Sequence, residues 1–490
     1  MGSRKIEDVM ANSEQINPIE YGAVGDAKTV CTHAIQESID RCAAVGGGIV
    51  CLPRGRYVTG TLFLKSGVTL DLEEDCILLG STDLSHYRRA VPKTFRSYTD
   101  IYTEKSLIYA ESEHDVAITG QGTIDGQGQE FSGPYLKRPY GIRFVTCTDV
   151  RVENVTLRNS AMWMQHYLAC DRVTIRGIKV WNHSNINNDM IDIDGCHDVL
   201  ITGCIGDSSD DGITIKSSCD RSCENVTVAN CTVASHCSAI KCGTESNGGF
   251  KNIYITDCIV VPSKQRHVIN GCHQGWAGLA LEIVDGGTLD NVTADNITID
   301  GSVAPIFMRL GDRGRPVGPD RSRPAIGSMR NIFLSNIKAT GGNSLGCVIA
   351  GLEGNEIENV TMRDLDFSFK GGGTRQDITR CFTELPNDYP ESVMFTKRVI
   401  GPIAEGDLEP DTFRLRGETC SMGRLPAYGL FFWHVKNVSL ENISLSTLTP
   451  DERPAVIFED AVGAVIDGQG ADGHSKDLSK DILFVANNGI

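Results

Sequence analysis

The sequence predicts an all-β fold, a right-handed parallel β-helix built from stacked coils. A polar residue followed by alternating β-formers recurs along the chain, and five such motifs start at Asp149, Arg172, Asp198, Asn225 and Asn252. Successive starts are 23, 26, 27 and 27 residues apart. A period of this length with strand-like alternation indicates a solenoid, in which each unit buries its inner face only by stacking on its neighbours. Right-handedness is the general expectation for parallel crossovers.

One helix is predicted ahead of the repeats, from Cys31 to Ala44, followed by the glycines 46–48 and the strand Ile49–Leu52. The end coil of a solenoid exposes an open sheet edge, which needs protection. We therefore expect this helix to cap the first coil.

The remaining organisation follows from the repeats. We expect residues 1–16 to be an N-terminal extension and residues 17–490 to form a single β-helix domain. Long segments near 310–329 and 385–428 interrupt the repeat, and we expect them to form walls of a binding cleft.

The cysteines and asparagines repeat with the strands. Cys204, Cys231 and Cys258 are 27 and 27 residues apart, so they should stack in one interior column, where a small thiol packs well. Disulfides are an alternative, and a metal site is a weaker one because the spacing of metal-binding Cys-x-x-Cys pairs is missing. Triplets such as Asn154-Val-Thr and Asn437-Val-Ser match the glycosylation pattern, but a corner asparagine before β-branched residues produces them automatically.

Charge and hydropathy exclude some partners. The formal net charge is −17, from 46 basic and 63 acidic residues, which argues against a nucleic-acid partner. It also disfavours a polyanionic sugar unless a local basic subsite binds it. The sequence has no apolar stretch near the roughly 20 residues of a membrane span and no apolar export signal at its N-terminus. We leave the native compartment open, since reduced cysteine columns suit the cytoplasm.

Three consecutive coils align without gaps over a cluster of acids. They are Asn187–Ile193, Ser209–Ile215 and His236–Cys242. In-phase residues of neighbouring coils stack, so Asp189 and Asp211 should lie one rung apart and His236 above Ser209. Asp210 adds a third acid, and such crowding costs stability and indicates a functional purpose.

Glycoside cleavage is one such purpose, because it needs a protonated carboxyl and an ionised carboxylate on opposite faces of the sugar. Asp189 and Asp211 can polarise a shared water, which implies an inverting mechanism. Asp210 would be the proton donor, its pKa raised by two charged neighbours. Turn capping and calcium binding are the alternatives.

The run from Asn187 to Ser217 resembles the signature of glycoside hydrolase family 28, the polygalacturonase family, and in particular its bacterial exo-acting branch. That family carries Asn-Thr-Asp-Gly, Gly-Asp-Asp, Gly-His-Gly and Arg-Ile-Lys motifs on a right-handed β-helix. Tyr21–Asp26 and Leu79–Asp83 are similar to the N-terminal portion of bacterial members, and Met162–His166 resembles their Trp-x-x-His element.

The resemblance implies roles for four residues. Asp210 would be the general acid, and Asp189 with Asp211 would activate the water. His236 falls where the Gly-His-Gly histidine would lie, as a helper that orients or tunes the acid. The family is usually secreted or periplasmic, and the resemblance implies neither a cofactor nor a metal.

The Arg-Ile-Lys motif is missing from this chain. Its equivalent places Ala280 and Glu282 where the two cations of the family would bind the galacturonate carboxylate. A glutamate would repel a uronate. Either another cation binds it, with Lys241 and Arg309 expected to point out of the core, or the scissile sugar is not galacturonate.

Further substrate contacts are expected from Glu245, Glu282 and Asp285, which could bind sugar hydroxyls. Trp163 and His166 would form the floor of one subsite by stacking and hydrogen bonding, with core packing the alternative for Trp163.

These features predict an inverting, metal-free, exo-acting glycosidase of pectic or related cell-wall oligosaccharides, monomeric or weakly homo-oligomeric. The alternatives are a β-helix polysaccharide lyase, a hydrolase of a non-galacturonate sugar such as a rhamnoside, and a non-catalytic carbohydrate-binding scaffold.

Overall fold

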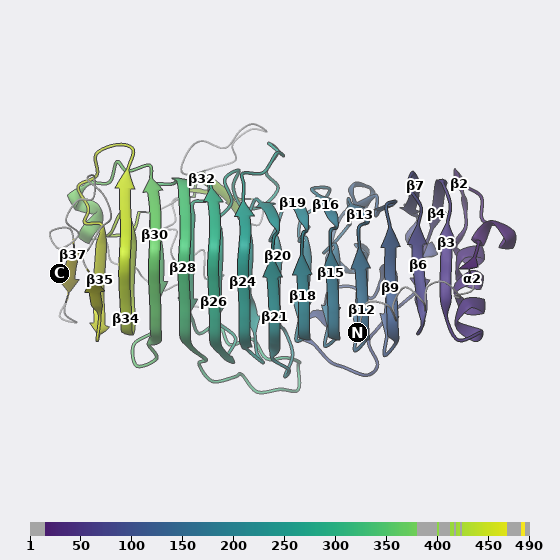
Figure 1. The fold of residues 1–490 in the computed structure, drawn as a ribbon, viewed down its shortest axis with the longest axis horizontal. Coiled ribbons are helices and arrows are strands. Elements are labelled where there is room, and N and C mark those ends of the chain that lie inside the picture. The colour runs from purple at the N-terminus through teal and green to yellow at the C-terminus, as the bar shows by residue number, and fades with distance from the viewer. Residues whose placement is uncertain are drawn as a thin grey trace, which may run out of the picture. The chain divides into compact units, whose positions relative to one another are not determined.

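The computed structural model is dominated by parallel strands, which confirms the predicted fold class. It describes residues 15–379, 399–400, 412–415, 418–421, 424–467 and 482–485. The chain divides into two compact units, Met1–Asn188 with Cys196–Ile205, and Asp189–Gly195 with Gly206–Ile490. In Figure 1 the strands of each unit lie parallel, and below each unit is described by itself. The single β-helix domain stays a prediction.

The first unit stacks short strands into three parallel columns. One column contains β1 (Gln15–Ile16), β3 (Gly48–Leu52), β6 (Val68–Leu72), β9 (His114–Gly120), β12 (Thr148–Glu153), β15 (Asp171–Arg176) and β18 (His197–Thr202). A second contains β2 (Asp26–Val30), β4 (Gly55–Thr59), β7 (Cys76–Gly80), β10 (Thr123–Asp125), β13 (Thr156–Arg158) and β16 (Lys179–Asn182). The third contains β5 (Leu62–Phe63), β8 (Ser106–Glu111), β11 (Tyr140–Val145) and β14 (Gln165–Leu168).

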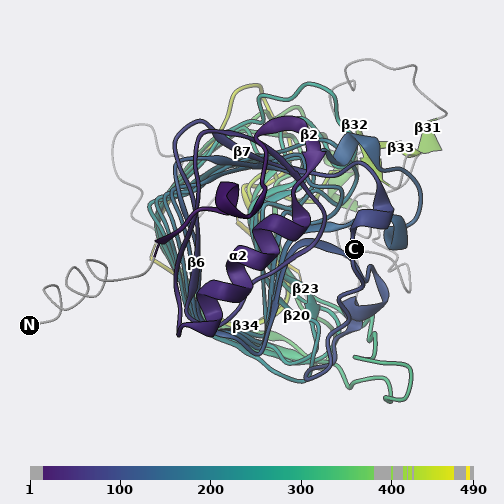
Figure 2. The ribbon, with the colours of Figure 1, turned by 90° about the vertical axis from the view of Figure 1, so that its right-hand side faces the viewer.

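Helix α2 (Thr32–Ala44) lies across the first coil, as Figure 2 shows. It contacts β3, β5 and β6 and buries one apolar face, which includes Ile35, Ile39 and Cys42. The predicted capping helix is therefore confirmed, beginning one residue later than expected.

The second unit continues the same pattern with longer strands. One column contains β17 (Ile191–Asp194), β20 (Ile213–Ser217), β23 (Ser238–Ser246), β25 (Ala277–Ile283), β27 (Ala304–Leu310), β29 (Cys347–Ala350), β34 (Leu430–Thr447), β35 (Val456–Val462) and β37 (Ile482–Val485). A second contains β21 (Cys223–Ala229), β24 (Phe250–Val260), β26 (Thr288–Asp300), β28 (Ser328–Gly342), β30 (Ile357–Phe369) and the remainder of β34, followed by β36 (Val465–Asp467). The short strand β22 (Thr232–Ser235) pairs with β24, and β19 (Ile205–Ser208) lies at the division of the chain.

The core of the second unit is a stack of in-register apolar side chains. Ile193, Ile215, Cys242 and Leu281 are successive register partners and are buried. Further along the same column, Phe432 and Phe458 are register partners, and their stacked rings have centroids 4.6 Å apart. Residues between these positions point to the other side of the sheet, because side chains alternate along a strand.

Corner asparagines confirm the structural interpretation of the Asn-x-Ser/Thr triplets. Asn225, Asn252 and Asn291 all have positive φ, between 56° and 63°. Their side-chain amides form a ladder, with Asn252 donating to Asn225 at 3.0 Å and Asn291 donating to Asn252 at 2.8 Å. Asparagine tolerates this left-handed conformation better than most residues, which explains its recurrence at the same corner.

All the cysteines that the structure describes are buried free thiols, so within those residues the disulfide alternative is wrong. Cys170 and Cys196 lie in contact one coil apart, with the Cys170 backbone N–H donating to the Cys196 Sγ at 3.3 Å. Cys381 lies outside the described residues, and of Cys420 only the backbone is described.

The structure describes the whole of one predicted long loop, near residues 310–329, and only part of the other. The segment between β27 and β28 carries two arginines that reach the site described below. Much of residues 385–428 lies outside the described residues, as does the extension 1–16 except for β1. The described part includes a small antiparallel sheet of β31 (Val399–Ile400), β33 (Glu418–Ser421) and β32 (Thr412–Leu415). Among the described helices, none is long and apolar enough to cross a membrane.

Candidate active site

The charged residues of the second unit gather in two columns on the outer side of β17, β20, β23, β25 and β27. Ile191, Ile213 and Ile240 are register partners, which confirms the predicted gap-free alignment of three coils. One column of outward residues contains Asp192, Lys241 and Ala280. The next column contains Glu282 and Arg309, which are register partners. Lys241 and Arg309 alternate with apolar residues along their strands, as expected, and both side chains are buried.

The three predicted catalytic aspartates lie on two adjacent turns of this stack. The Met190 N–H donates to the Asp211 carbonyl at 3.0 Å, which fixes the coil of Asp189 beside that of Asp211. The Ser238 N–H from the third coil donates to the Asp211 Oδ1, also at 3.0 Å. Gly212 permits this stacking, because a Cβ there would lie 2.3 Å from the Ala239 carbonyl oxygen.

The three aspartates differ in exposure and in ionisation. Asp189 and Asp211 are 2% and 7% exposed, whereas Asp210 is half-buried. Burial, followed by the charge of Asp211, raises the pKa of Asp210 from 3.8 to about 6. Burial and the neighbouring acids Asp192 and Asp210 raise the pKa of Asp189 well above its usual range, in spite of a nearby lysine. The group that titrates near neutrality is therefore the one that reaches solvent.

Hydrogen bonds fix the orientation of Asp210. Its Oδ1 accepts from the Asp211 N–H at 3.0 Å, and its Oδ2 accepts from the Asn270 amide at 3.3 Å. The same amide nitrogen lies 3.4 Å from the Cys237 sulfur. His236 is buried, and its Nε2 lies 2.9 Å from the Gln265 carbonyl oxygen.

Two lysines lie among the acids. The Lys241 Nζ is 3.2 Å from the Asp211 Oδ2 and 3.4 Å from the Glu282 Oε1. Lys216 has a similar position between Asp189 and Glu245, with Nζ–O distances of 3.5 Å to each. Each lysine therefore forms ion pairs with one of the two predicted base aspartates and with a glutamate from a later coil.

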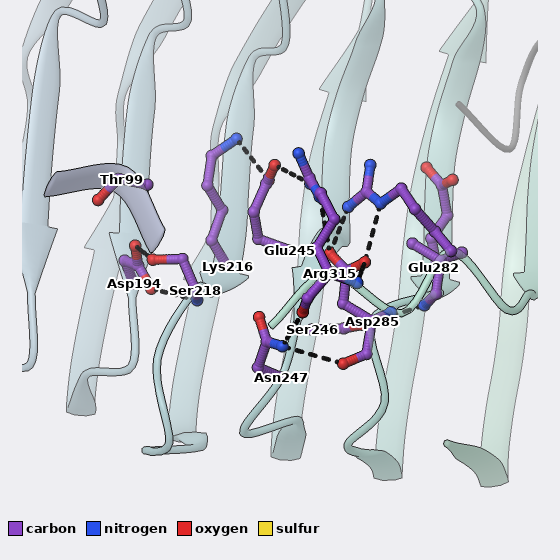
Figure 3. A network of polar contacts seen from close by, with 12 residues as sticks. Thr99, Asp194, Lys216, Ser218, Glu245, Ser246, Asn247, Glu282, Asp285 and Arg315 are labelled. Atoms are coloured by element: carbon purple, nitrogen blue, oxygen red, sulfur yellow. Dashed lines mark hydrogen bonds and ion pairs between the residues drawn. The ribbon is translucent and has the colours of Figure 1, made fainter. Parts of the chain in front are cut away.

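Two arginines from the segment between β27 and β28 complete this cluster. Arg313 and Arg315 both pair with Asp285, at 2.5 and 3.3 Å, and Arg315 also pairs with Glu245 at 2.7 Å. Figure 3 shows Lys216, Glu245, Arg315 and Asp285 as one connected series. Thus Glu245 and Asp285, which were expected to bind sugar hydroxyls, both form ion pairs with arginines.

Comparison with known proteins agrees with this geometry. The family model described as "Glycosyl hydrolases family 28" matches residues 71–385. The chain belongs to glycosyl hydrolases family 28. A "Probable polygalacturonase" of Vitis vinifera is 33% identical over 272 residues, which are 50% of this chain and 55% of that protein. The chain thus spans about half the length of this curated relative.

Two solved structures share the fold, the right-handed parallel β-helix. One is an exopolygalacturonase from Thermotoga maritima, with TM-score 0.62 and 23% identity, covering 75% of this chain and 91% of that one. The other is a family 28 exopolygalacturonase from Yersinia enterocolitica, with TM-score 0.67 and 17% identity, covering 94% and 79%.

The predicted replacement of the Arg-Ile-Lys cations by Ala280 and Glu282 can be compared with the register of the coils. Ala280 is the register partner of Lys241, one coil away, and the small side chain of Ala280 is fully buried. Lys241 therefore supplies a cation in the column of Ala280, and Glu282 binds this cation. Arg309, the other expected cation, is buried and donates to the Gly351 carbonyl at 3.5 Å. Neither side chain is exposed toward solvent, and their contact with substrate stays a prediction.

The Trp-x-x-His element of the family belongs to the first unit. Trp163 and His166 are buried with their ring centroids 5.1 Å apart, and both contact Tyr140. The indole also meets the ring of Tyr102 edge-on at 5.6 Å. This packing accounts for the position of Trp163 without a ligand, and the role of the pair in substrate binding stays a prediction.

One group of side chains offers metal-ligand atoms at close range within the described residues. The donor atoms of Asp210, Asp211 and Cys237 all lie within 4.8 Å of one another. Two of these are the carboxylates expected to perform proton transfer, so the group belongs to the same site, and the metal-free mechanism stays a prediction.

The sequence did not single out five residues of this site. They are Asp192, Lys216, Asn270, Arg313 and Arg315. Asp192 and Lys216 could have been found, because they lie inside the aligned coils at positions that alternate with core isoleucines. The arginines could not, since Arg315 lies 70 residues from Glu245 along the chain.

Proposed function

We propose that this family 28 chain hydrolyses pectic galacturonan from the chain end, with inversion at the cleaved carbon. The observation that carries this proposal is Asp210, a half-buried carboxyl whose pKa is raised to about 6 beside two buried aspartates. At the mildly acidic pH at which a pKa near 6 leaves the carboxyl protonated, Asp210 can donate a proton to the leaving oxygen.

Two aspartates, Asp189 and Asp211, can act as the base that accepts a proton from the attacking water, and each lies next to a different lysine. The Lys241 Nζ lies 3.2 Å from the Asp211 carboxylate, and the Lys216 Nζ, 3.5 Å from Asp189, opposes the effect of burial on the pKa of Asp189. An ionised carboxylate can accept a proton from the attacking water while Asp210 protonates the leaving group. Inversion follows because water attacks the face opposite the departing oxygen.

Exo attack is supported by the relatives. The Thermotoga and Yersinia proteins, which share the fold, are both exopolygalacturonases. The segment between β27 and β28 also contributes Arg313 and Arg315 to the site. A segment in this position can form a wall that restricts the binding of a long polymer.

A deciding experiment incubates the protein with oligogalacturonides and follows the anomer of the product by NMR. We expect release of single terminal sugars with inverted configuration, lost in Asp210→Asn with the circular dichroism spectrum retained. A retained anomer would contradict the inverting mechanism, and unchanged turnover in the variant would refute the assignment of Asp210.

A second candidate is hydrolysis at a neutral sugar such as a rhamnoside, and a specific observation favours it. Lys241 lies in the column of Ala280 but is bound by Asp211 and Glu282, so its charge is already balanced by two carboxylates. Assaying rhamnogalacturonan fragments and neutral side-chain oligosaccharides in parallel separates the two candidates. Chelator-insensitive turnover without an unsaturated product would exclude a lyase.

A further inference from the structure

Lys216, the last residue but one of β20, has a buried ammonium group that lies among acids. Its Nζ lies 3.5 Å from the Asp189 Oδ2, 3.3 Å from the Asp192 Oδ1 and 3.5 Å from the Glu245 Oε2. One of these acids, Asp189, is assigned to the base side of the proposed reaction. The other two have no assigned part in the chemistry.

Asp189 would be difficult to ionise without a cation. Both Asp189 and Asp192 are almost completely buried, and each charge opposes the other. Burial raises the pKa of Asp192 to about 8, and burial with the charge of Asp192 raises that of Asp189 well above its usual range even with Lys216 beside it, so without the lysine it would be higher still. A protonated Asp189 cannot accept a proton from water, so the site needs a positive charge at this point.

Lys216 is kept charged by the residues on its far side. Burial alone would lower its pKa, but Glu245, Asp192 and Asp189 together hold it well above its ordinary value. Burial alone would likewise raise the pKa of Glu245, but Lys216 and Arg315 hold it well below. The ammonium therefore stays protonated throughout the neutral range.

A β-bulge produces this arrangement. Ile215 pairs with Cys242 and Ser217 pairs with Ser246, so three residues of β23 stand opposite the single residue Lys216. The bulge places Glu245 against the ammonium. Without it, strict pairing would continue the ladder and place residue 243 opposite Lys216.

The other charged groups nearby form hydrogen bonds or ion pairs with further residues. Asp194, the register partner of Lys216, accepts from the Ser218 backbone at 2.8 Å. Lys241 pairs with Asp211 and with Glu282. Arg313 pairs with Asp285, and Asp210 is held by the Asp211 backbone and Asn270. Lys216 is thus a cation in contact with Asp189.

We propose that Lys216 is a positioning residue, whose ammonium stabilises the carboxylate form of Asp189 and so sets the pH at which Asp189 can accept a proton from the attacking water. The inference rests on the proposed function. Asp192 opposes this effect, and Glu245 with Arg315 maintains it.

The test compares pH profiles of kcat/KM for oligogalacturonide hydrolysis. In Lys216→Met the acidic limb should move to higher pH by about 1–3 units, the range by which one adjacent cation shifts an acid. In Asp192→Asn the limb should move to lower pH, because one opposing charge is removed. Lys216→Arg should retain the wild-type limb, and Lys338→Met, at an exposed position on β28, serves as the unchanged control. A limb that does not move in Lys216→Met overturns the proposal.

A second measurement works without substrate and covers the case in which Lys216→Met does not fold. The Asp189 carboxyl is titrated by ¹³C NMR in aspartate-labelled protein, with its resonance assigned by its loss in Asp189→Asn. The double variant Asp192→Asn/Lys216→Met removes both members of an ion pair, which leaves the net charge of the cluster unchanged, and takes the place of Lys216→Met. The Asp189 pKa should be higher in the double variant than in Asp192→Asn alone, and equal values overturn the proposal. If the wild type releases no sugar but this titration behaves as expected, the proposed function fails while the role of Lys216 stands.

Discussion

Asp210→Asn should stabilise the protein at neutral pH while removing its activity. Folding raises the pKa of this carboxyl from 3.8 to about 6, which corresponds to about 3 kcal/mol. The folded state favours the protonated acid. The contribution of protonated Asp210 to the free energy of unfolding is therefore complete below pH 3.8 and is lost as the pH rises through 6. Asparagine resembles the protonated acid at every pH, so the variant avoids this loss.

The assay is urea unfolding of both proteins at several pH values between 4 and 8. The variant's advantage in free energy of unfolding should grow with pH toward an upper limit of about 3 kcal/mol, since the half-buried carboxyl is partly screened by solvent. Asp366→Asn, at an exposed carboxylate on β30, is the control and should show a difference near zero. The reasoning is refuted if Asp210→Asn gains nothing over wild type between pH 4 and pH 7.

Three further predictions concern other parts of the fold. Lys241→Met leaves Asp211 and Glu282 buried without their cation and should cost about 3–5 kcal/mol in urea unfolding, an expectation that wild-type stability would contradict. Phe432→Ala removes a fully buried ring of the core stack and should cost about 3–5 kcal/mol while leaving KM unchanged, so a change in KM at full stability would argue against a purely structural role. Because the described cysteines are free thiols, dithiothreitol should not change Tm, and a fall in Tm would indicate a disulfide involving Cys381 or Cys420.

Most of the fold could be predicted because a solenoid repeats its local rules. The corner asparagines, the period of 23 to 27 residues and the alternation of apolar residues are each weak alone, but they recur in phase. The capping helix was found because its apolar face follows helical periodicity. The division of the chain into two units was not predicted, since the repeat continues without interruption through Asn188 and Ile205.

The candidate site could be predicted only in part. The phase of the repeat was sufficient to align Asp189 with Asp211, because both belong to uninterrupted coils. The position of Glu245 depends on a bulge, which inserts residues without changing the sequence pattern. Arg315 reaches the cluster from a segment with no periodicity, and no local rule relates it to a residue 70 positions away. Ion pairing across coils is a tertiary property that single-strand patterns do not contain.

The pairing of Lys241 with Ala280 has a consequence for tracing how such sites diverge. These residues are 39 positions apart in sequence yet occupy adjacent rungs of one column. A cation can therefore disappear from one rung and be present on the next while its charge remains in nearly the same place. Substitutions in this family should accordingly be compared down the column, where residues on adjacent coils can place a charge in nearly the same position.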